Sequence, residues 1–268
     1  MTPAGPAGRP GARPARWPML AAVALVFAGD FELRRRDVGE ALGGSVDVFI
    51  LFELAVFGAV FAWMFLVVAQ PPRRRDHAPE LLATWVLVGL LAVSALWASS
   101  PTLAVARSIQ LLVTMAFAHV LARRGGRTQF HLIGHAYVVL ITLGVLVGAV
   151  FRRPPDRVAD RFAWAYTHPV VAGSLLALSL TLLVAWTFDR RAPRSFPDVV
   201  YPLLLVLHAG ALLATQTRGS ILGYLAGLFV FAWFSASRSR RAGVILIGLL
   251  ALPLAVVGLG SAVTQVLT

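Results

Sequence analysis

The chain has 268 residues, of which 58% are hydrophobic and 13% are charged, and its mean hydropathy is +0.78. A water-soluble domain of this length cannot bury that much apolar surface in one core. Apolar runs close to the length of a bilayer crossing recur along the chain, so the composition predicts an all-α, polytopic helical membrane protein. Cysteine is absent, which excludes disulfides and thiolate metal sites.

The net charge of +12 comes from arginine alone, since the sequence contains no lysine. That uniformity makes the choice of arginine at any one position weak support for bidentate recognition. The arginines stand in short clusters between apolar runs and do not gather on one basic face. This distribution is typical of membrane orientation, and we expect no nucleic-acid partner.

Residues 1–16 are rich in Pro, Gly, Ala and Arg and predict a disordered cytoplasmic leader. The first span is predicted at 17–29. Val26-Phe27-Ala28 also fits a signal-peptidase site, but an uncleaved span is favoured because many spans follow. Either alternative leaves the next loop outside, so the topology downstream is the same.

Eight further spans give about nine transmembrane helices in residues 17–268. Arginine clusters occupy alternate loops, which places the N-terminus in the cytoplasm and Thr268 outside by the positive-inside rule. The further spans are predicted at 48–69, 81–97, 103–122, 130–150, 169–187, 199–214, 220–235 and 242–260.

Two outer positions depart from that charge pattern. The loop 151–168 carries four arginines against two aspartates, and Arg218 stands alone in the loop 215–219. Interfacial arginines that bind lipid phosphates are the ordinary explanation for such exceptions. Trp164 and Tyr166 are interpreted as interfacial anchors, with a platform for a sugar ring as the alternative.

The helices that start near His168 and Gly219 both begin on the predicted outer side, where they present the positive ends of their dipoles. Thr167 or His168 can cap the first helix, and Ser220 offers a hydroxyl at the second. Each start is preceded by an arginine, Arg161 or Arg218. If the two helices are neighbours, their starts predict an anion site.

Other polar residues inside the spans have simpler interpretations. A Glu53–Arg107 ion pair is predicted, because an unpaired charge in a span is costly. His208 is interpreted as a buried histidine with satisfied hydrogen bonds, and capping or water contacts are expected for the other helical histidines. No residue set has the spacing of a metal site, and no glycine-rich phosphate loop or nucleophile elbow occurs. Those other histidines are His119, His131 and His135.

Three stretches in residues 80–235 resemble the O-antigen ligase and polysaccharide polymerase-like membrane proteins. Thr217-Arg218-Gly219-Ser220, followed by apolar residues, resembles that family's Ser/Thr-Arg-Gly helix start. The segment 94–101, with Arg107 after it, is similar to the family's ALWS-x-x-P turn and downstream arginine. The segment 167–173 looks like its His-Pro helix start, except that Val170 stands where the family has Asn.

The resemblance implies a metal-independent glycosyltransferase of the bacterial plasma membrane that needs no cofactor. Such enzymes transfer a glycan from an undecaprenyl-diphosphate carrier to an acceptor hydroxyl on the outer face, either on lipid A core or on a growing polysaccharide. The arginines are expected to stabilise the departing diphosphate. The catalytic residues implied are Arg161 and Arg218, and the substrate-binding residues are Arg157, the alternate for Arg161, with Trp164, Tyr166, His168, Gly219 and Ser220.

Members of that family continue into a large outer loop bearing a histidine, where this chain reaches Thr268. We therefore expect the C-terminal part of the family pattern to be missing and residues 1–268 alone to be inactive. A transporter or flippase for an anionic lipid-linked substrate is the alternative function, although no repeat or polar midplane is present. A non-catalytic membrane scaffold, or an inactive truncated homologue, is the third.

Overall fold

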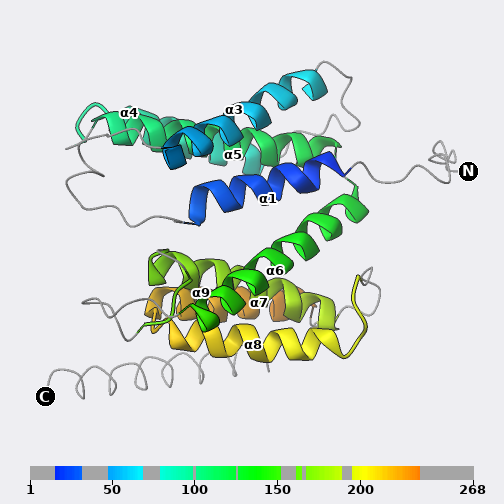
Figure 1. The fold of residues 1–268 in the computed structure, drawn as a ribbon. Coiled ribbons are helices and arrows are strands. Elements are labelled where there is room, and N and C mark those ends of the chain that lie inside the picture. The colour runs from blue at the N-terminus through cyan, green and yellow to red at the C-terminus, as the bar shows by residue number, and fades with distance from the viewer. Residues whose placement is uncertain are drawn as a thin grey trace, which may run out of the picture. The chain divides into compact units, whose positions relative to one another are not determined.

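The computed structural model describes residues 16–31, 48–68, 79–98, 101–124, 126–151, 161–164, 167–188 and 195–235. Within these ranges the protein is all-α, with eight helices (Figure 1). They are α1 (Trp17–Asp30), α3 (Val48–Val68), α4 (Pro79–Ser94), α5 (Pro101–Arg124), α6 (Arg127–Val150), α7 (Pro169–Phe188), α8 (Val200–Ala214) and α9 (Arg218–Ser235).

Each helix matches a predicted span to within three residues at both ends. Three of the helices, α4, α5 and α7, start at a proline, whose missing N–H group needs no partner in the first turn of a helix. The predicted ninth span, 242–260, lies outside the described residues, and so do residues 1–15 of the predicted leader.

Four of the described helices are long and apolar enough to cross a membrane. The other four are apolar but shorter. Large apolar side chains such as Phe65, Leu66 and Val206 are exposed, as expected for side chains that face lipid. Length and composition therefore indicate a multi-pass membrane protein. The four long stretches are Val48–Leu66, Ala104–Arg124, Arg127–Val150 and Pro169–Thr187.

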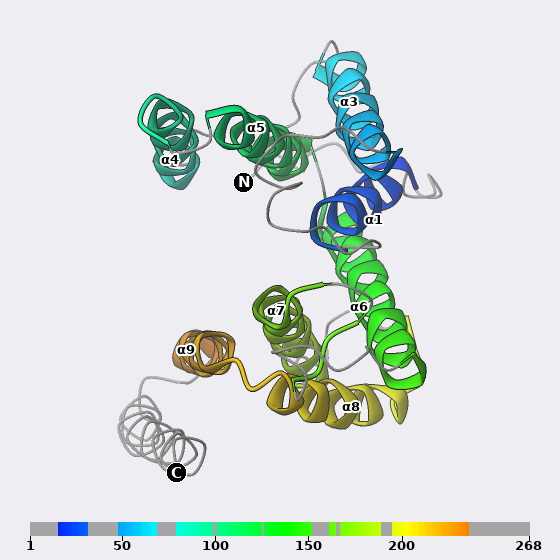
Figure 2. The same ribbon diagram turned by 60° about the vertical axis from the view of Figure 1, so that its left-hand side comes forward.

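The chain divides into two compact units. Unit 1 (Met1–Gly29 and Asp37–Ala136) contains α3, α4, α5, nearly all of α1 and the first part of α6. In this unit α5 lies between α3 and α4 (Figure 2). Its core joins α1, α3 and α5 through apolar side chains that include Leu25, Phe57 and Phe117.

Unit 2 (Asp30–Arg36 and Tyr137–Thr268) contains the rest of α6 together with α7, α8 and α9. Here α7 packs against both α8 and α9, which meet each other mainly at their connection (Figure 2). Leu183 and Trp186 of α7 form a buried cluster with Val138 of α6 and Tyr201 of α8. The candidate site described next lies wholly within unit 2.

Candidate anion-binding site

The start of α7 is capped by His168. The Val170 N–H donates to His168 Nδ1 at 3.3 Å, and the Ala172 N–H donates to the His168 carbonyl oxygen at 3.0 Å. This is the usual pattern of an N-cap residue followed by proline at the first helical position. Thr167, the other predicted cap, instead directs its hydroxyl to the carbonyl oxygen of Asp30 at 3.5 Å.

The capping bond also decides which nitrogen of the exposed His168 ring carries its proton. Because a backbone N–H can only donate, Nδ1 accepts, and the neutral ring must hold its proton on Nε2. His168 therefore presents a hydrogen-bond donor at Nε2.

The connection between α8 and α9 is a tight reversal. Gln216 has a φ of 50°, in the left-handed region that non-glycine residues seldom adopt. Its N–H donates to the Leu213 carbonyl oxygen at 3.0 Å, which closes the end of α8. After this turn α9 begins at Arg218, so Arg218 is the first residue of a helix and does not lie in a loop over 215–219 as predicted.

The start of α9 lies directly beside the start of α7. The Thr217 hydroxyl donates to the carbonyl oxygen of Pro169 at 3.1 Å. The Ser220 hydroxyl lies 3.3 Å from the Ser174 hydroxyl and 3.5 Å from the carbonyl oxygen of Val170. The two helix starts are therefore neighbours at the same end of unit 2.

The first turn of α9 has no side-chain cap among the described residues. Thr217 holds the capping position, and its hydroxyl donates to Pro169 or, at 3.2 Å, to the carbonyl oxygen of Thr215. In the described part of the chain, no side chain accepts from the N–H groups of Arg218, Gly219 or Ser220. A side chain at Gly219 would meet open space, and Arg218 is exposed. The positive end of α9 is thus open to an anion.

Arg161 lies at this same end. The N–H of its neighbour Phe162 donates to the carbonyl oxygen of Ala214 at 2.8 Å, which ties the segment 161–164 to the last residue of α8. The Arg161 side chain is exposed and has no ion pair among the described residues. Arg157 and Tyr166, the other residues of this loop that were predicted to bind substrate, lie outside the described residues.

Trp164 differs from both of its sequence-based interpretations. Only 1% of the residue is exposed, and its ring lies 5.4 Å from the ring of Phe31 between centroids. A methyl group on Gly144 of α6 would come within 3.0 Å of the Trp164 ring. Trp164 is therefore a packed core residue and forms neither an interfacial anchor nor a sugar platform, because its ring faces have no accessible surface.

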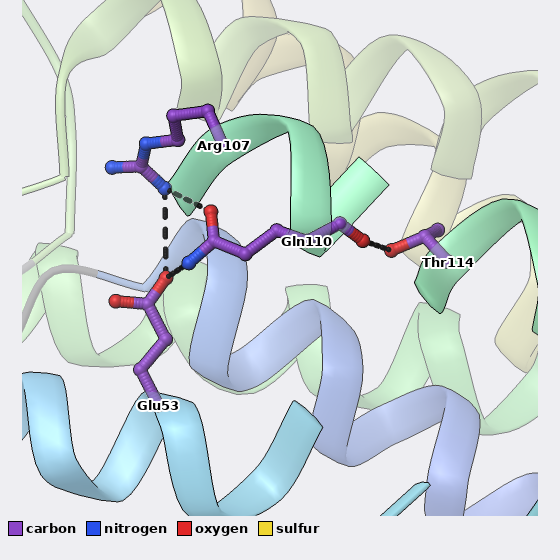
Figure 3. Close-up of polar contacts among 4 residues, drawn as sticks. All are labelled: Glu53, Arg107, Gln110 and Thr114. Carbon is purple, nitrogen blue, oxygen red and sulfur yellow. Dashed lines mark hydrogen bonds and ion pairs between the residues drawn. The ribbon is translucent and has the colours of Figure 1, made fainter. Parts of the chain in front are cut away.

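In unit 1, Glu53 and Arg107 form the ion pair that the sequence predicted, with 3.5 Å between Oε1 and Nη1 (Figure 3). Gln110 completes the cluster: its Nε2 donates to Glu53 Oε1, and its Oε1 accepts from Arg107 Nη1 at 2.8 Å. Sequence analysis missed Gln110, because a single uncharged polar residue in a helix carries no distinguishing signal.

The buried His208 has partners on two other helices, in agreement with its interpretation as a satisfied core histidine. None of it is exposed; Nε2 lies 2.9 Å from the Thr142 hydroxyl of α6, and Nδ1 lies 2.8 Å from the Ser179 hydroxyl of α7. Among the described residues, no group of three histidines or carboxylates is placed to hold a metal ion.

The other three helical histidines also bond to protein groups, where capping or water contacts were expected. His119 Nδ1 accepts from the Trp85 indole at 3.2 Å. His131 Nε2 accepts from Arg127 at 3.4 Å, and His135 Nδ1 lies 2.7 Å from the His131 carbonyl oxygen. The first contact joins α4 to α5, whereas the other two lie within α6, and the three do not converge on a common point.

The starts of α7 and α9 thus offer uncapped backbone N–H groups at α9, the exposed Arg218 and one imidazole N–H donor, and the exposed Arg161 lies in a segment that is bonded to the end of α8. All of these groups favour an anion with several oxygens, such as a phosphate or diphosphate. Comparison of the chain with models of known protein families, with curated proteins and with solved structures finds no match.

Proposed function

We propose that this chain provides the diphosphate-binding part of a membrane glycosyltransferase of the O-antigen ligase and polymerase-like kind, which acts on an undecaprenyl-diphosphate-linked glycan. The observation that carries the proposal is the contact between the starts of α7 and α9, made by the Thr217 hydroxyl on the Pro169 carbonyl oxygen. It brings the dipole ends of two helices, together with Arg218, to one place. The proposal includes nine spans, a cytoplasmic N-terminus and a site at the outer face of the bacterial plasma membrane.

In this reaction an acceptor hydroxyl oxygen attacks the anomeric carbon of the glycan. The bond between that carbon and the diphosphate oxygen breaks, its electron pair stays on the diphosphate, and the hydroxyl proton is lost to a base. Negative charge therefore grows on the leaving diphosphate in the transition state. We expect Arg218, Arg161 and the open N–H groups of α9 to stabilise that charge, with His168 Nε2 as a further donor.

The diphosphate chemistry also accounts for the absence of a capping side chain on α9. A serine or threonine oxygen in the usual position would occupy the N–H groups of the first turn. Thr217 holds that position, but in the described part of the chain its oxygen accepts from none of these N–H groups, which stay available to a ligand. The contacts of Thr217 and Ser220 with α7 hold the two helix starts together.

Replacement of Arg218 or Arg161 by alanine tests the proposal. Each variant is expected to lower glycan transfer from the lipid carrier at least 100-fold, the effect of removing one preorganised transition-state donor, which is about 3 kcal/mol. Transfer is measured in membranes that contain the full-length protein, with radiolabelled lipid-linked glycan. Membrane insertion is checked by the yield of monodisperse protein.

Arg127→Ala is the matched control. Arg127 is also an exposed arginine at the first position of an apolar helix, but α6 starts on the predicted cytoplasmic side. This variant is expected to transfer glycan as the wild type does. If Arg161→Ala and Arg218→Ala also transfer at the wild-type rate, the site assignment is wrong. The non-catalytic scaffold hypothesis expects that result.

A further inference from the structure

The Glu53–Arg107 pair of unit 1 is made in an unusual way. Arginine and carboxylate groups in a dedicated structural pair commonly bind side by side through two parallel hydrogen bonds. Here only Nη1 and Oε1 face each other, at 3.5 Å, and Gln110 bonds to the same two atoms. Gln110 therefore bonds to the two atoms that face each other, Nη1 of Arg107 and Oε1 of Glu53.

The outer atoms of both groups take no part in these hydrogen bonds. In the described part of the chain, Arg107 Nη2 and Nε and Glu53 Oε2 have no hydrogen-bond partner. Figure 3 shows Nη2 and Oε2 pointing to the same side, away from Gln110. The Arg107 side chain is 58% exposed and the Glu53 side chain 15%. A row of exposed guanidinium donors thus stands beside the acceptor of a mostly buried carboxylate.

The pair lies near the N-terminal ends of α3 and α5, two helices that are long and apolar enough to cross a membrane. Glu53 follows the start of α3 by five residues and Arg107 follows the start of α5 by six, which is about 8 and 9 Å along the helix axis. Long side chains this close to the end of a span extend toward the headgroup region. Exposed polar atoms at that depth need partners from lipid or water, because hydrocarbon supplies none.

We propose that the free edges of Arg107 and Glu53 bind the headgroup of a zwitterionic lipid that carries an ammonium with N–H groups, that is, a phosphoethanolamine headgroup. The lipid phosphate accepts from Arg107 Nη2 and Nε, and the lipid ammonium donates to Glu53 Oε2. The site is separate from the candidate site of unit 2, and the inference does not depend on the proposed function.

Charge complementarity selects this headgroup over others. The protein pair has no net charge, so a purely anionic headgroup gains at Arg107 but is repelled by Glu53. A phosphocholine headgroup has the same charges as phosphoethanolamine but no ammonium N–H, so it cannot donate to Oε2. A headgroup with both a phosphate and a donating ammonium pairs the free atoms of both protein groups with atoms of opposite charge.

Lipid retention by the full-length protein tests this proposal. The protein is equilibrated with equal amounts of phosphatidylethanolamine, phosphatidylglycerol and phosphatidylcholine that have identical acyl chains, and the bound lipids are counted by native mass spectrometry. The wild type is expected to retain phosphatidylethanolamine about tenfold over the other two, as one charge-assisted hydrogen bond predicts.

Two variants separate the two halves of the site. Glu53→Gln keeps an acceptor for Gln110 but loses the charge, so the preference for phosphatidylethanolamine over phosphatidylcholine is expected to disappear. Arg107→Gln is expected to lower retention of all three lipids, and Arg107→Lys replaces it if the glutamine variant does not fold. Thr114→Val is the control, because the Thr114 hydroxyl bonds only to the backbone oxygen of Gln110.

Three results overturn the proposal: equal retention of the three lipids by the wild type, strongest retention of phosphatidylglycerol, or an unchanged preference in Glu53→Gln. The first means that the pair only joins α3 to α5. The second means that Arg107 binds anionic phosphate without help from Glu53, and the third means that the ammonium is recognised elsewhere.

Discussion

Gly173 of α7 and Ser220 of α9 are in such close contact that a methyl group on Gly173 would lie 2.8 Å from the Ser220 hydroxyl oxygen. The same methyl group would lie 3.1 Å from the hydroxyl oxygen of Thr215. Small residues at contacts between membrane helices let their backbones approach closely. This close approach allows Thr217 and Ser220 to reach the backbone oxygens of α7, so the candidate anion site depends on the absence of a side chain at position 173.

Gly173→Ala is therefore expected to destabilise unit 2 by about 1–3 kcal/mol, the usual cost of inserting a methyl group into a close-packed contact. The free energy of unfolding in mixed micelles measures the effect. Ser220→Gly removes the group that the methyl meets and is expected to restore most of the loss when combined with Gly173→Ala. Gly223→Ala is the control, because a Cβ at Gly223 meets nothing within 4 Å. Equal effects at Gly173 and Gly223 contradict the close contact.

The hydrogen bonds of His208 are expected to stabilise unit 2. His208→Leu leaves Ser179 without its partner, whereas Thr142 retains a bond to the Val138 carbonyl oxygen. Bonds between membrane helices are worth about 0.6–2 kcal/mol each, and loss of both is expected to cost about 1–3 kcal/mol in the free energy of unfolding. A double-mutant cycle with Ser179→Ala measures the share of that bond, and strict additivity of the two variants means that the two side chains do not interact.

The capping role of His168 is tested by two substitutions. Asparagine offers an acceptor oxygen at the same place, so His168→Asn is expected to keep the stability of the wild type. His168→Leu removes the acceptor and is expected to cost about 1 kcal/mol in the free energy of unfolding. Nitrogen-15 spectra of the wild type, with the His168 signal assigned by its loss in His168→Asn, are expected to show a protonated Nε2 and an unprotonated Nδ1. A protonated Nδ1 contradicts the cap.

Helix positions were predictable because the signal for them is local. An apolar run of sufficient length predicts a helix without reference to any other part of the chain. A proline at the first position marks a helix start in the same way, as at Pro101 and Pro169. A boundary that depends on a turn was predicted less closely: α9 begins at Arg218, whereas the predicted span begins at 220, and the left-handed conformation of Gln216 lets the helix begin there. Glutamine gives no sequence signal for that conformation.

The environment of a side chain was predictable only where an unpaired charge inside a span would be costly. A carboxylate and a guanidinium in neighbouring spans stabilise each other by forming an ion pair. The Glu53–Arg107 pair was expected for this reason, and it is present. An aromatic ring carries no charge, so no such cost decides where it lies. Trp164 suits an interface or a core equally well by composition, and only its packing against Gly144 and Phe31 places it inside.

The sequence by itself determined that the chain is helical and apolar enough to cross a membrane several times, because burial of hydrophobic runs and satisfaction of their backbone hydrogen bonds act within each segment. Only the tertiary structure decided that the beginnings of α7 and α9 touch, that Thr217 bonds to Pro169 and leaves the first turn of α9 open, and that Gln110 joins the ion pair. Both hydrogen bonds join residues far apart along the chain, and both depend on how each helix is rotated about its axis. That rotation is set by the packing of small residues such as Gly173 against the neighbouring helix.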